Sequence, residues 1–369
     1  MQKNLKYALY KYSSRNIGDE IQAIAARQFL PRVDYYIDRD LIGDWKNSNQ
    51  NEEVKLIANA WYMSDPMHWP IKDTTLDPLF ISMHIHESED VLNIFSSRKS
   101  VDYLKKYKNI GARDKSTKDF FEKLGLRSDF TACLTLTLQR DDKIKKRDFI
   151  LCVTVGDEVY ESIKRNTDRN VIRIDTTTFN RDLSVDERMK LAEQFLFLYQ
   201  SAHLVVTTRL HAALPSLALE TPITYITDTG AANYDSSRLE GLKELTNNMT
   251  EEEFLVNVDD VNFDKPHENP QTYLEYRKRL IETSETFTGS KKSKSFAVLN
   301  DFSDFRIESS EVMKVIVSEF DRRVDTMKNY IEELEKQNYE IRGHLDQLNT
   351  IRISSRKLIA NIRRRLTIK

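Results

Sequence analysis

Cysteine is scarce in this 369-residue chain: only Cys133 and Cys152 occur, each inside an apolar, strand-like run. We therefore expect two buried thiols and a compartment in which disulfides are not used. No stretch approaches the roughly 18 consecutive apolar residues that suggest a membrane span. The opening residues, MQKNLKYALYKYSS, also lack the apolar run and cleavage site of a secretory signal. These absences predict a cytoplasmic protein.

An excess of positive charge is also missing, since the net charge is -2 and the pI is about 6.4. This balance argues against a dedicated nucleic-acid binder. Neither a GxGxxG motif nor a P-loop lysine is present, which argues against a nucleotide-triphosphate hydrolase. His84 and His86 share one face of a strand and could suggest a metal site, but no further ligand has supportive spacing. We expect no metal and no cofactor.

What the chain does contain is an alternation of strands and helices of the length that gives parallel α/β sheets. The charged run 140–148 has no apolar face and reads as a linker between an N-terminal lobe, 1–140, and a C-terminal lobe, 148–285. Ser116 is the expected N-cap of a helix that ends at Gly125, and Ser184 opens a capping box. The expected strands cover 5–12, 33–37, 54–60, 79–85, 110–114, 149–155, 171–176, 203–208 and 222–226.

The last seventy or so residues, 300–369, have a different pattern. Apolar residues follow a 3-4 spacing over 320–350, with Asn338 alone at an a position, which is typical of a parallel two-stranded coiled coil. We expect a homodimer, the alternative being one long helix packed on its own body. Residues 351–369 hold seven basic and no acidic residues and predict an amphipathic helix on an anionic membrane surface. A solvated helix end is the alternative.

The segment HLVVTTRLHAALPSLALETPITYI places Arg209 and His211 where a buried strand gives way to a helix. Ligands bind at this edge of parallel sheets, and the helix start offers N–H groups to an anion. A cation and an imidazole there could hold a phosphate and transfer a proton. From these residues alone, a surface arginine and a core-lining histidine are the favoured interpretation.

The same segment resembles the polysaccharide pyruvyl transferase family, whose hallmark is an Arg-Leu-His triplet at this junction. Five further segments resemble that family in the same order, and together they cover about residues 5–245: NIGDEIQAIAARQFLP, VDYYIDRD, IANAWYMSDPMHWP, GARDKSTKDFFEKLGLRSDFTACLTLTL and YDSSRLEGL. The resemblance implies two Rossmann-like lobes similar to GT-B glycosyltransferases, with the active site between them. It also implies phosphoenolpyruvate as donor and a glycan acceptor, free or lipid-linked, which becomes a pyruvate ketal in surface polysaccharide synthesis.

Carried over by position, Arg209, Leu210 and His211 match the family's donor-site triplet, with Leu210 as well as Arg209 expected to bind substrate. Arg113 matches the family's Arg-Asp segment, and Arg238 matches a common basic position. Three arginines suit a donor with nearly three negative charges, because their planar forks bind carboxylate and phosphate. We assign proton transfer to His211, since histidine titrates near neutrality.

Two further groups belong to this interpretation. Asp19 is the candidate for orienting or deprotonating the sugar hydroxyl, or else the N-cap of the first helix. An aromatic cluster in the first lobe is expected either to bind a sugar or to belong to the hydrophobic core, and the sequence favours neither: Trp61, Tyr62, His68 and Trp69. The competing functions are a GT-B-type glycosyltransferase with an activated sugar donor and a non-catalytic assembly protein.

Overall fold

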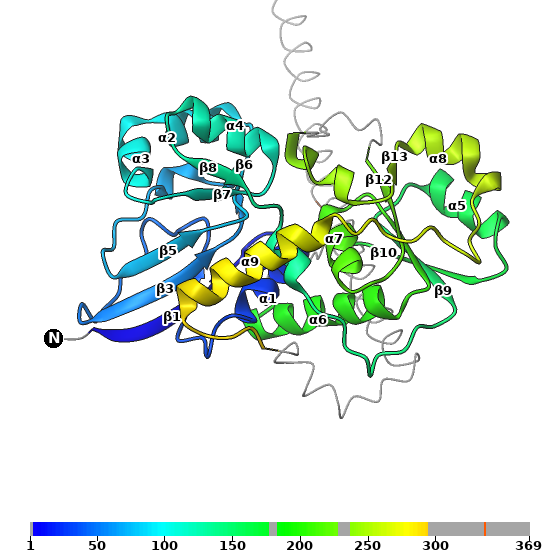
Figure 1. Cartoon of the computed structure of the whole chain (residues 1–369), viewed down its shortest axis with the longest axis horizontal. Helices are drawn as coiled ribbons and strands as arrows, with labels where there is room; N and C mark the ends of the chain where they lie inside the picture. The colour runs from blue at the N-terminus through cyan, green and yellow to red at the C-terminus, as the bar shows by residue number, and fades with distance from the viewer. Residues whose placement is uncertain (1–2, 177–182, 228–236, 294–335, 337–369) are drawn as a thin grey trace, which may run out of the picture. The chain divides into compact units, whose positions relative to one another are not determined.

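The computed structural model describes residues 3–176, 183–227, 237–293 and 336. The chain divides into two compact units, Met1–Phe305 and Arg306–Lys369. Apart from Lys336, the heptads of 320–350 and the basic segment 351–369 lie outside the described residues, so the dimer and the membrane contact stay predictions. The described part of the first unit contains two parallel sheets, each in its own lobe (Figure 1).

The first lobe is built on a four-stranded sheet in the order β2-β1-β3-β5, all parallel. Its strands are β1 (Asn4–Lys11), β2 (Tyr35–Asp38), β3 (Glu52–Ala58) and β5 (Leu76–Phe80). Two small parallel pairs, β4-β6 and β7-β8, lie beside it. The other elements are α1 (Gly18–Arg27), β4 (Trp61–Tyr62), η1 (Pro66–His68), β6 (His84–Ile85), α2 (Glu89–Ser96), α3 (Arg98–Leu104), β7 (Ile110–Ala112), α4 (Lys115–Lys123), β8 (Ser128–Phe130) and η2 (Leu134–Thr137).

The second lobe holds a five-stranded parallel sheet in the order β10-β9-β11-β12-β13. Every residue of β9 and β11 is buried, which explains why β9 is a continuous apolar run and β11 is apolar up to Thr207. This α/β architecture with parallel sheets is the predicted fold class. The elements are β9 (Phe149–Val153), α5 (Asp157–Arg165), β10 (Asn170–Ile174), α6 (Val185–Ser201), β11 (Leu204–Thr207), α7 (Leu210–Ala218), β12 (Ile223–Ile226), η3 (Ser237–Leu239), η4 (Lys243–Leu245), β13 (Asn248–Met249), α8 (Glu251–Asn257), η5 (Val258–Asp260) and α9 (Tyr273–Thr288).

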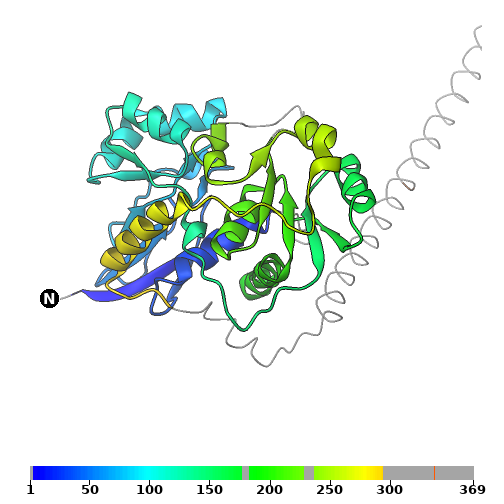
Figure 2. The same cartoon turned by 45° about the vertical axis from the view of Figure 1, so that its right-hand side comes forward.

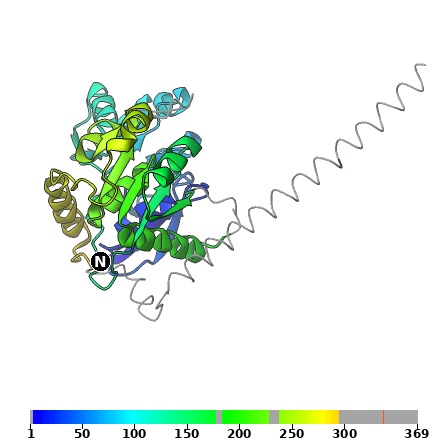
Figure 3. The same cartoon turned by 90° about the vertical axis from the view of Figure 1, so that its right-hand side faces the viewer.

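Helix α9 returns from the second lobe and packs on the first, as Figures 1 and 2 show in yellow. At one end Arg277 donates to the carbonyl oxygens of Leu138 and Ala218, at 2.9 and 3.3 Å. At the other end the hydroxyl of Tyr7 donates to the carbonyl of Thr288 at 3.2 Å. In the view of Figure 3, α9 lies to one side of the sheets.

Helices α1 and α6 join the two lobes through two ion pairs. Nη2 of Arg27 lies 2.5 Å from Glu193, and Nε of Arg188 lies 2.5 Å from Glu20. All four residues are buried or nearly so. Burial raises the pKa of Glu20 to about 7, although the hydrogen bond from Arg188 opposes that shift.

Some helix ends were predicted correctly from local sequence signals, and others were not. The capping box of Ser184 and Glu187 is present, and Gly125 has the left-handed φ of +71° that suits a helix end. Ser116, however, is already helical, and the N-cap is Asp114, whose carboxylate accepts from the N–H of Thr117 at 2.9 Å. The single strand expected over 79–85 is also wrong: it is divided into β5 and β6 at Ser82, which has φ 54°.

Candidate active site

The Arg-Leu-His triplet lies at the start of α7, directly after the buried strand β11. Arg209 is the N-cap residue, with extended backbone, and its N–H donates to the hydroxyl of Thr207 at 2.9 Å. Leu210 is 1% exposed and anchors the helix start in the core. The Arg209 side chain is half-buried, and its Nε has no hydrogen-bond partner in the part of the chain that the structure describes. This helix start therefore keeps an unsatisfied donor.

His211 is 7% exposed, and its Nε2 lies 3.7 Å from the sulfur of Cys133. Burial lowers the pKa of His211 well below its usual value, and the positive charges of Arg113 and Arg238 lower it further. Both arginines come from elsewhere in the sequence: Arg113 follows β7, and Arg238 lies on η3. His211 is therefore a neutral imidazole at the centre of a positively charged cluster.

Gly18 is the point at which the first lobe contacts His211 closely. A Cβ at Gly18 would lie 2.9 Å from Cβ of His211 and 3.1 Å from its Nδ1, closer than side chains pack. The N–H of the preceding residue, Ile17, also donates to the carbonyl of Thr176 in the second lobe at 2.9 Å. Glycine at this position lets the start of α1 touch the start of α7.

Arg113 is 1% exposed, although it carries a guanidinium group. Its Nε lies 3.6 Å from the carboxylate of Asp114, beyond a hydrogen bond, and its Nη2 has no hydrogen-bond partner among the described residues. Burial lowers the pKa of Arg113, and the nearby charge of Arg238 adds to that effect against the opposing charge of Asp114. Two cations held together with an unsatisfied donor form a site that an anion would stabilise.

A buried pair that was not predicted from the sequence, His84 and Asp114, lies beside this cluster. Nδ1 of His84 lies 2.7 Å from Oδ2 of Asp114, and both side chains are completely buried. Burial raises the pKa of Asp114, but the charges of His84 and Arg113 more than offset this and hold it below its usual value. The ionised carboxylate only accepts hydrogen bonds, so Nδ1 carries the proton. The Arg-Asp segment was a visible signal for Asp114, but nothing in the sequence linked it to His84.

His84 and His86 have different partners and are not arranged as a metal pair. The ring of His86 lies 4.9 Å from that of Trp61. Within residues 3–176, 183–227 and 237–293, no group of three or more His, Cys, Asp or Glu side chains could hold a metal ion.

Asp19 lies in the first turn of α1 but is not its N-cap, which is Ile17. Its carboxylate accepts from the hydroxyl of Ser14 at 2.5 Å and from the amide of Gln22 at 3.2 Å. Nη1 of Arg39 lies 3.7 Å from the same carboxylate. The structure therefore contradicts the capping alternative and places Asp19 in a hydrogen-bonded pocket with a counter-charge.

The aromatic cluster of the first lobe has two parts. Tyr62 and Trp69 are buried and belong to the core, with ring centroids 5.7 Å apart. His68 lies apart from them near the surface and pairs with Asp44. Trp61 is half-buried, and the guanidinium of Arg39 lies 5.2 Å from its ring. Of the four, Trp61 alone adjoins Asp19, through Arg39.

Of the predicted site residues, Arg113, Arg238 and His211 come together, because each arginine charge acts on the pKa of His211. Asp19 is near enough for its charge to favour the protonated form of Arg113. Arg209 and Leu210 share the helix start with His211. Between the described residues, no direct interaction joins the Arg209 side chain to the other three charged groups.

A family model described as polysaccharide pyruvyl transferase matches residues 16–228. The matched span includes Asp19, His84, Arg113 and the triplet from Arg209 to His211, and it ends before Arg238. More than half of the chain lies within the match.

Several solved structures have a similar arrangement at low identity. An uncharacterized protein from Klebsiella pneumoniae subsp. pneumoniae matches with TM-score 0.41 and 12% identity, over 68% of this chain and 92% of its own. The UDP-GlcNAc 2-epimerase of Methanocaldococcus jannaschii has TM-score 0.37 and 12% identity, over 76% and 99%. The wall teichoic acid polymerase TagF has TM-score 0.36 and 10% identity, over 85% and 89%. No curated protein matches the chain in a sequence comparison.

Proposed function

This chain belongs to the polysaccharide pyruvyl transferase family, and from that membership we propose that it transfers the pyruvyl group of phosphoenolpyruvate to a glycan, forming a pyruvate ketal. The observation that carries the proposal is Arg113. Its guanidinium is buried beside His211 and Arg238, and its Nε and Nη2 both lack a hydrogen-bond partner among the described residues. Leaving such a donor unsatisfied costs about 1–3 kcal/mol, which a bound anion would recover.

Phosphoenolpyruvate suits this cluster because it has a carboxylate and a phosphate close together, both attached to C2 of a small enol. We assign Arg113 and Arg238 to one donor clamp, together with Arg209 at the start of α7. The N–H groups and the positive dipole end of that helix add to the attraction for an anion. Leu210 holds the helix start and takes no chemical part.

Ketal formation requires three changes in the donor and acceptor. C3 of the enol gains a proton, one sugar hydroxyl adds at C2, and a second hydroxyl replaces the phosphate. Two protons leave the hydroxyls, one proton goes to C3, and the other leaves with the phosphate. An acid–base group that cycles between two forms is therefore needed, and histidine is suited to this.

Two histidines are available, and their surroundings differ. His211 is buried and has two arginines nearby, so its neutral form is favoured, and we assign it to accepting or relaying a proton. His84 has the carboxylate of Asp114 on Nδ1, which fixes its tautomer. Burial and the charge of Arg113 nevertheless lower the pKa of His84 below its usual value, so its neutral form is favoured as well. We assign His84, held by Asp114, to relaying a proton, with Asp19 orienting the acceptor hydroxyl.

The direct test is to incubate the protein with phosphoenolpyruvate and candidate lipid-linked glycans, and to follow phosphate release and the glycan mass. Ketal formation should release one phosphate for each pyruvyl group added. His211→Ala should abolish both signals while the protein stays folded. Transfer of a sugar from a nucleotide-sugar donor, with no use of phosphoenolpyruvate, would instead support a glycosyltransferase.

None of the described helices is long and apolar enough to cross a bilayer. The proposed attachment to an anionic membrane surface therefore rests on the basic segment 351–369 alone. Such attachment would bring the enzyme to a lipid-linked acceptor.

A further inference from the structure

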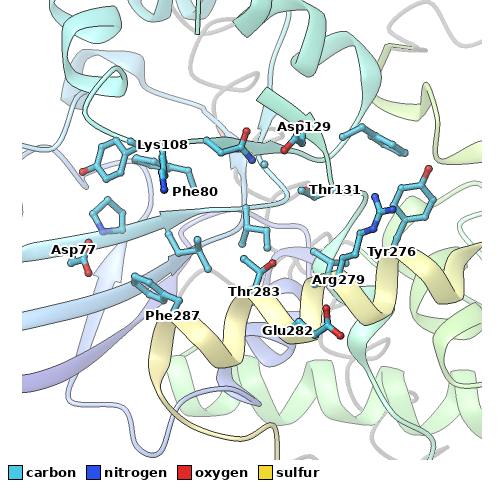
Figure 4. Close-up of a pocket in the computed structure, with 18 residues that line it drawn as sticks. Asp77, Phe80, Lys108, Asp129, Thr131, Tyr276, Arg279, Glu282, Thr283 and Phe287 are labelled. Atoms are coloured by element: carbon cyan, nitrogen blue, oxygen red, sulfur yellow. The ribbon is translucent and has the colours of Figure 1, made fainter. Parts of the chain in front are cut away.

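A cavity of about 770 Å³ lies between α9 and the open edge of the first sheet. Edge strand β5, the segments around β7 and β8, and one face of α9 form its walls (Figure 4). None of the candidate active-site residues is among the described residues that line it. Its volume is in the range of about 300–1,000 Å³ that holds a small ligand.

The walls carry aromatic rings that the fold leaves partly exposed. Tyr276 on α9 packs edge-on against Phe130, with ring centroids 5.2 Å apart, and Tyr107 packs edge-on against Phe80 at 4.8 Å. Except for Phe80, these rings are only half-buried. In Figure 4, Tyr276 and Asp77 lie toward opposite ends of the cavity. Rings of this kind offer flat surfaces to the C–H faces of a sugar, while a tyrosine hydroxyl remains available for hydrogen bonding.

The charged groups of the cavity differ in sign from those of the active site. Three carboxylates and two cations line it, so the lining has a net charge of -1: Asp77, Asp129 and Glu282 against Lys108 and Arg279. A polyphosphate or other polyanion would be repelled by such a surface. A hydroxyl group both donates and accepts hydrogen bonds, so it suits carboxylates and cations alike.

The cavity adjoins the two segments that carry the active-site arginines. Gly111 lines it, and a Cβ there would lie 2.9 Å from the side chain of Thr131; Arg113 follows two residues later. Phe130 packs on Gly241, where a Cβ would lie 2.8 Å from the ring, three residues after Arg238. A polymer with one sugar in the active site must place its other sugars nearby on the surface.

We propose that this cavity binds neutral sugar units of the acceptor glycan, next to those that receive the pyruvyl group. This inference rests on the proposed function for the identity of the ligand. The aromatic rings bind the sugar faces, Asp129 and Asp77 accept from hydroxyls, and Arg279 donates to them. The acceptor is therefore recognised over several sugars and not only at the reacting hydroxyls.

The test is binding, measured by saturation-transfer NMR and calorimetry with neutral tetrasaccharides of glucose, galactose, mannose and N-acetylglucosamine, and with dextran sulfate as an anionic probe. At least one neutral tetrasaccharide should bind, and more tightly than dextran sulfate. Tyr276→Ala and the near-isosteric Asp129→Asn should each weaken that binding by roughly tenfold, the effect of losing one good contact. Leu274→Ala, an exposed position of α9 outside the cavity, should leave it unchanged.

Thermal midpoints of the variants separate lost contacts from lost folding, and Asp129→Asn keeps the side-chain volume. Binding by no tetrasaccharide, preference for dextran sulfate, or equal binding by both cavity variants and the unchanged protein would each overturn the inference. Phosphate release from phosphoenolpyruvate is scored separately. A protein that binds sugars in this cavity but never releases phosphate would contradict the proposed function, whereas the reverse result would contradict the cavity alone.

Discussion

Asp114 accepts a hydrogen bond from Nδ1 of His84 at 2.7 Å, and the same oxygen lies 3.6 Å from Nε of Arg113. One buried carboxylate thus joins an imidazole to the cation that we assign to the donor. Its other oxygen accepts from the N–H of Thr117 at 2.9 Å and caps α4. Asp114 therefore has a structural role through Oδ1 and an electrostatic role through Oδ2.

Replacing Asp114 by Asn separates these roles. Asparagine also caps helices well, so α4 should persist and the thermal midpoint should stay within a few degrees of the original. The amide cannot hold the His84 tautomer as a carboxylate does, and turnover should fall by roughly 10²–10⁴-fold, the usual worth of acid–base catalysis. A pH–rate profile should also lose the limb due to His84. If turnover of the variant stays within about threefold of the original and its pH–rate profile is unchanged, the His84–Asp114 pair has only a structural role.

The donor clamp predicts losses of affinity for phosphoenolpyruvate that calorimetry can measure. Arg209→Ala and Arg238→Ala should each weaken binding by about 1.5–3 kcal/mol, the range for hydrogen bonds to charged groups. Arg113→Lys should also weaken it, because the charge is kept but the planar fork is lost. Arg173→Ala, on the surface of β10, serves as the control. Any of the three that binds the donor normally does not belong to the clamp.

The sequence predicted the second lobe better than the first, for a physical reason. The buried parallel strand β9 is apolar throughout, β11 is apolar up to Thr207, and α6 has a capping box, so the sequence pattern agrees with the structure. In the first lobe, β6 and β7 have only two and three residues, and a left-handed residue, Ser82, interrupts the expected strand. Short strands leave little periodicity to read.

The distance between residues along the sequence explains which site residues were predicted. Arg209 and His211 are two residues apart at one strand end, so their proximity follows from local structure. His84 and Asp114 are thirty positions apart and meet because of a single bridge, Met83 to Ala112, beside their strands. No local pattern specifies such a register. The burial of Arg113 also depends on both lobes, and no local pattern in the sequence predicts it.

Gly18 offers a test of the contact between lobes. Its backbone φ is not left-handed, so Gly18→Ala should fold, but the new Cβ would lie 2.9 Å from Cβ of His211. Relief of this clash moves His211 or separates α1 from α7, and turnover should fall by at least roughly tenfold. Gly156→Ala, with only a side-chain atom of Glu251 at 3.4 Å, is the matched control. Equal activity of the two variants would show that His211 tolerates the displacement.

The heptads of 320–350 predict a parallel homodimer, although they lie outside the described residues. Ile331 and Leu334 occupy neighbouring a and d positions, so the full chain with Ile331→Glu and Leu334→Glu should place charges in the seam. Light scattering at micromolar concentration should show a dimer for the original chain and a monomer for the variant. Glu332→Gln and Glu333→Gln, outside the seam, form the control. A monomeric original chain would refute the pairing.

The ion pair of Glu20 and Arg188 predicts how stability depends on pH. Burial raises the pKa of Glu20 from 4.5 to about 7, so between these values the folded protein holds a proton that the unfolded chain has lost. The stabilisation from this group is complete below pH 4.5 and is lost as the pH rises through 7.

Glu20→Gln cannot ionise, so the free energy of unfolding of the original protein, minus that of the variant, should decrease as the pH rises over this window. Urea denaturation at about pH 5, 6, 7 and 8 measures the difference. Glu161→Gln, at an exposed position of α5, is the control for removing a carboxylate. A difference that stays constant with pH, or increases, would mean that Arg188 keeps Glu20 ionised, and the contact between the lobes would then be a permanent ion pair.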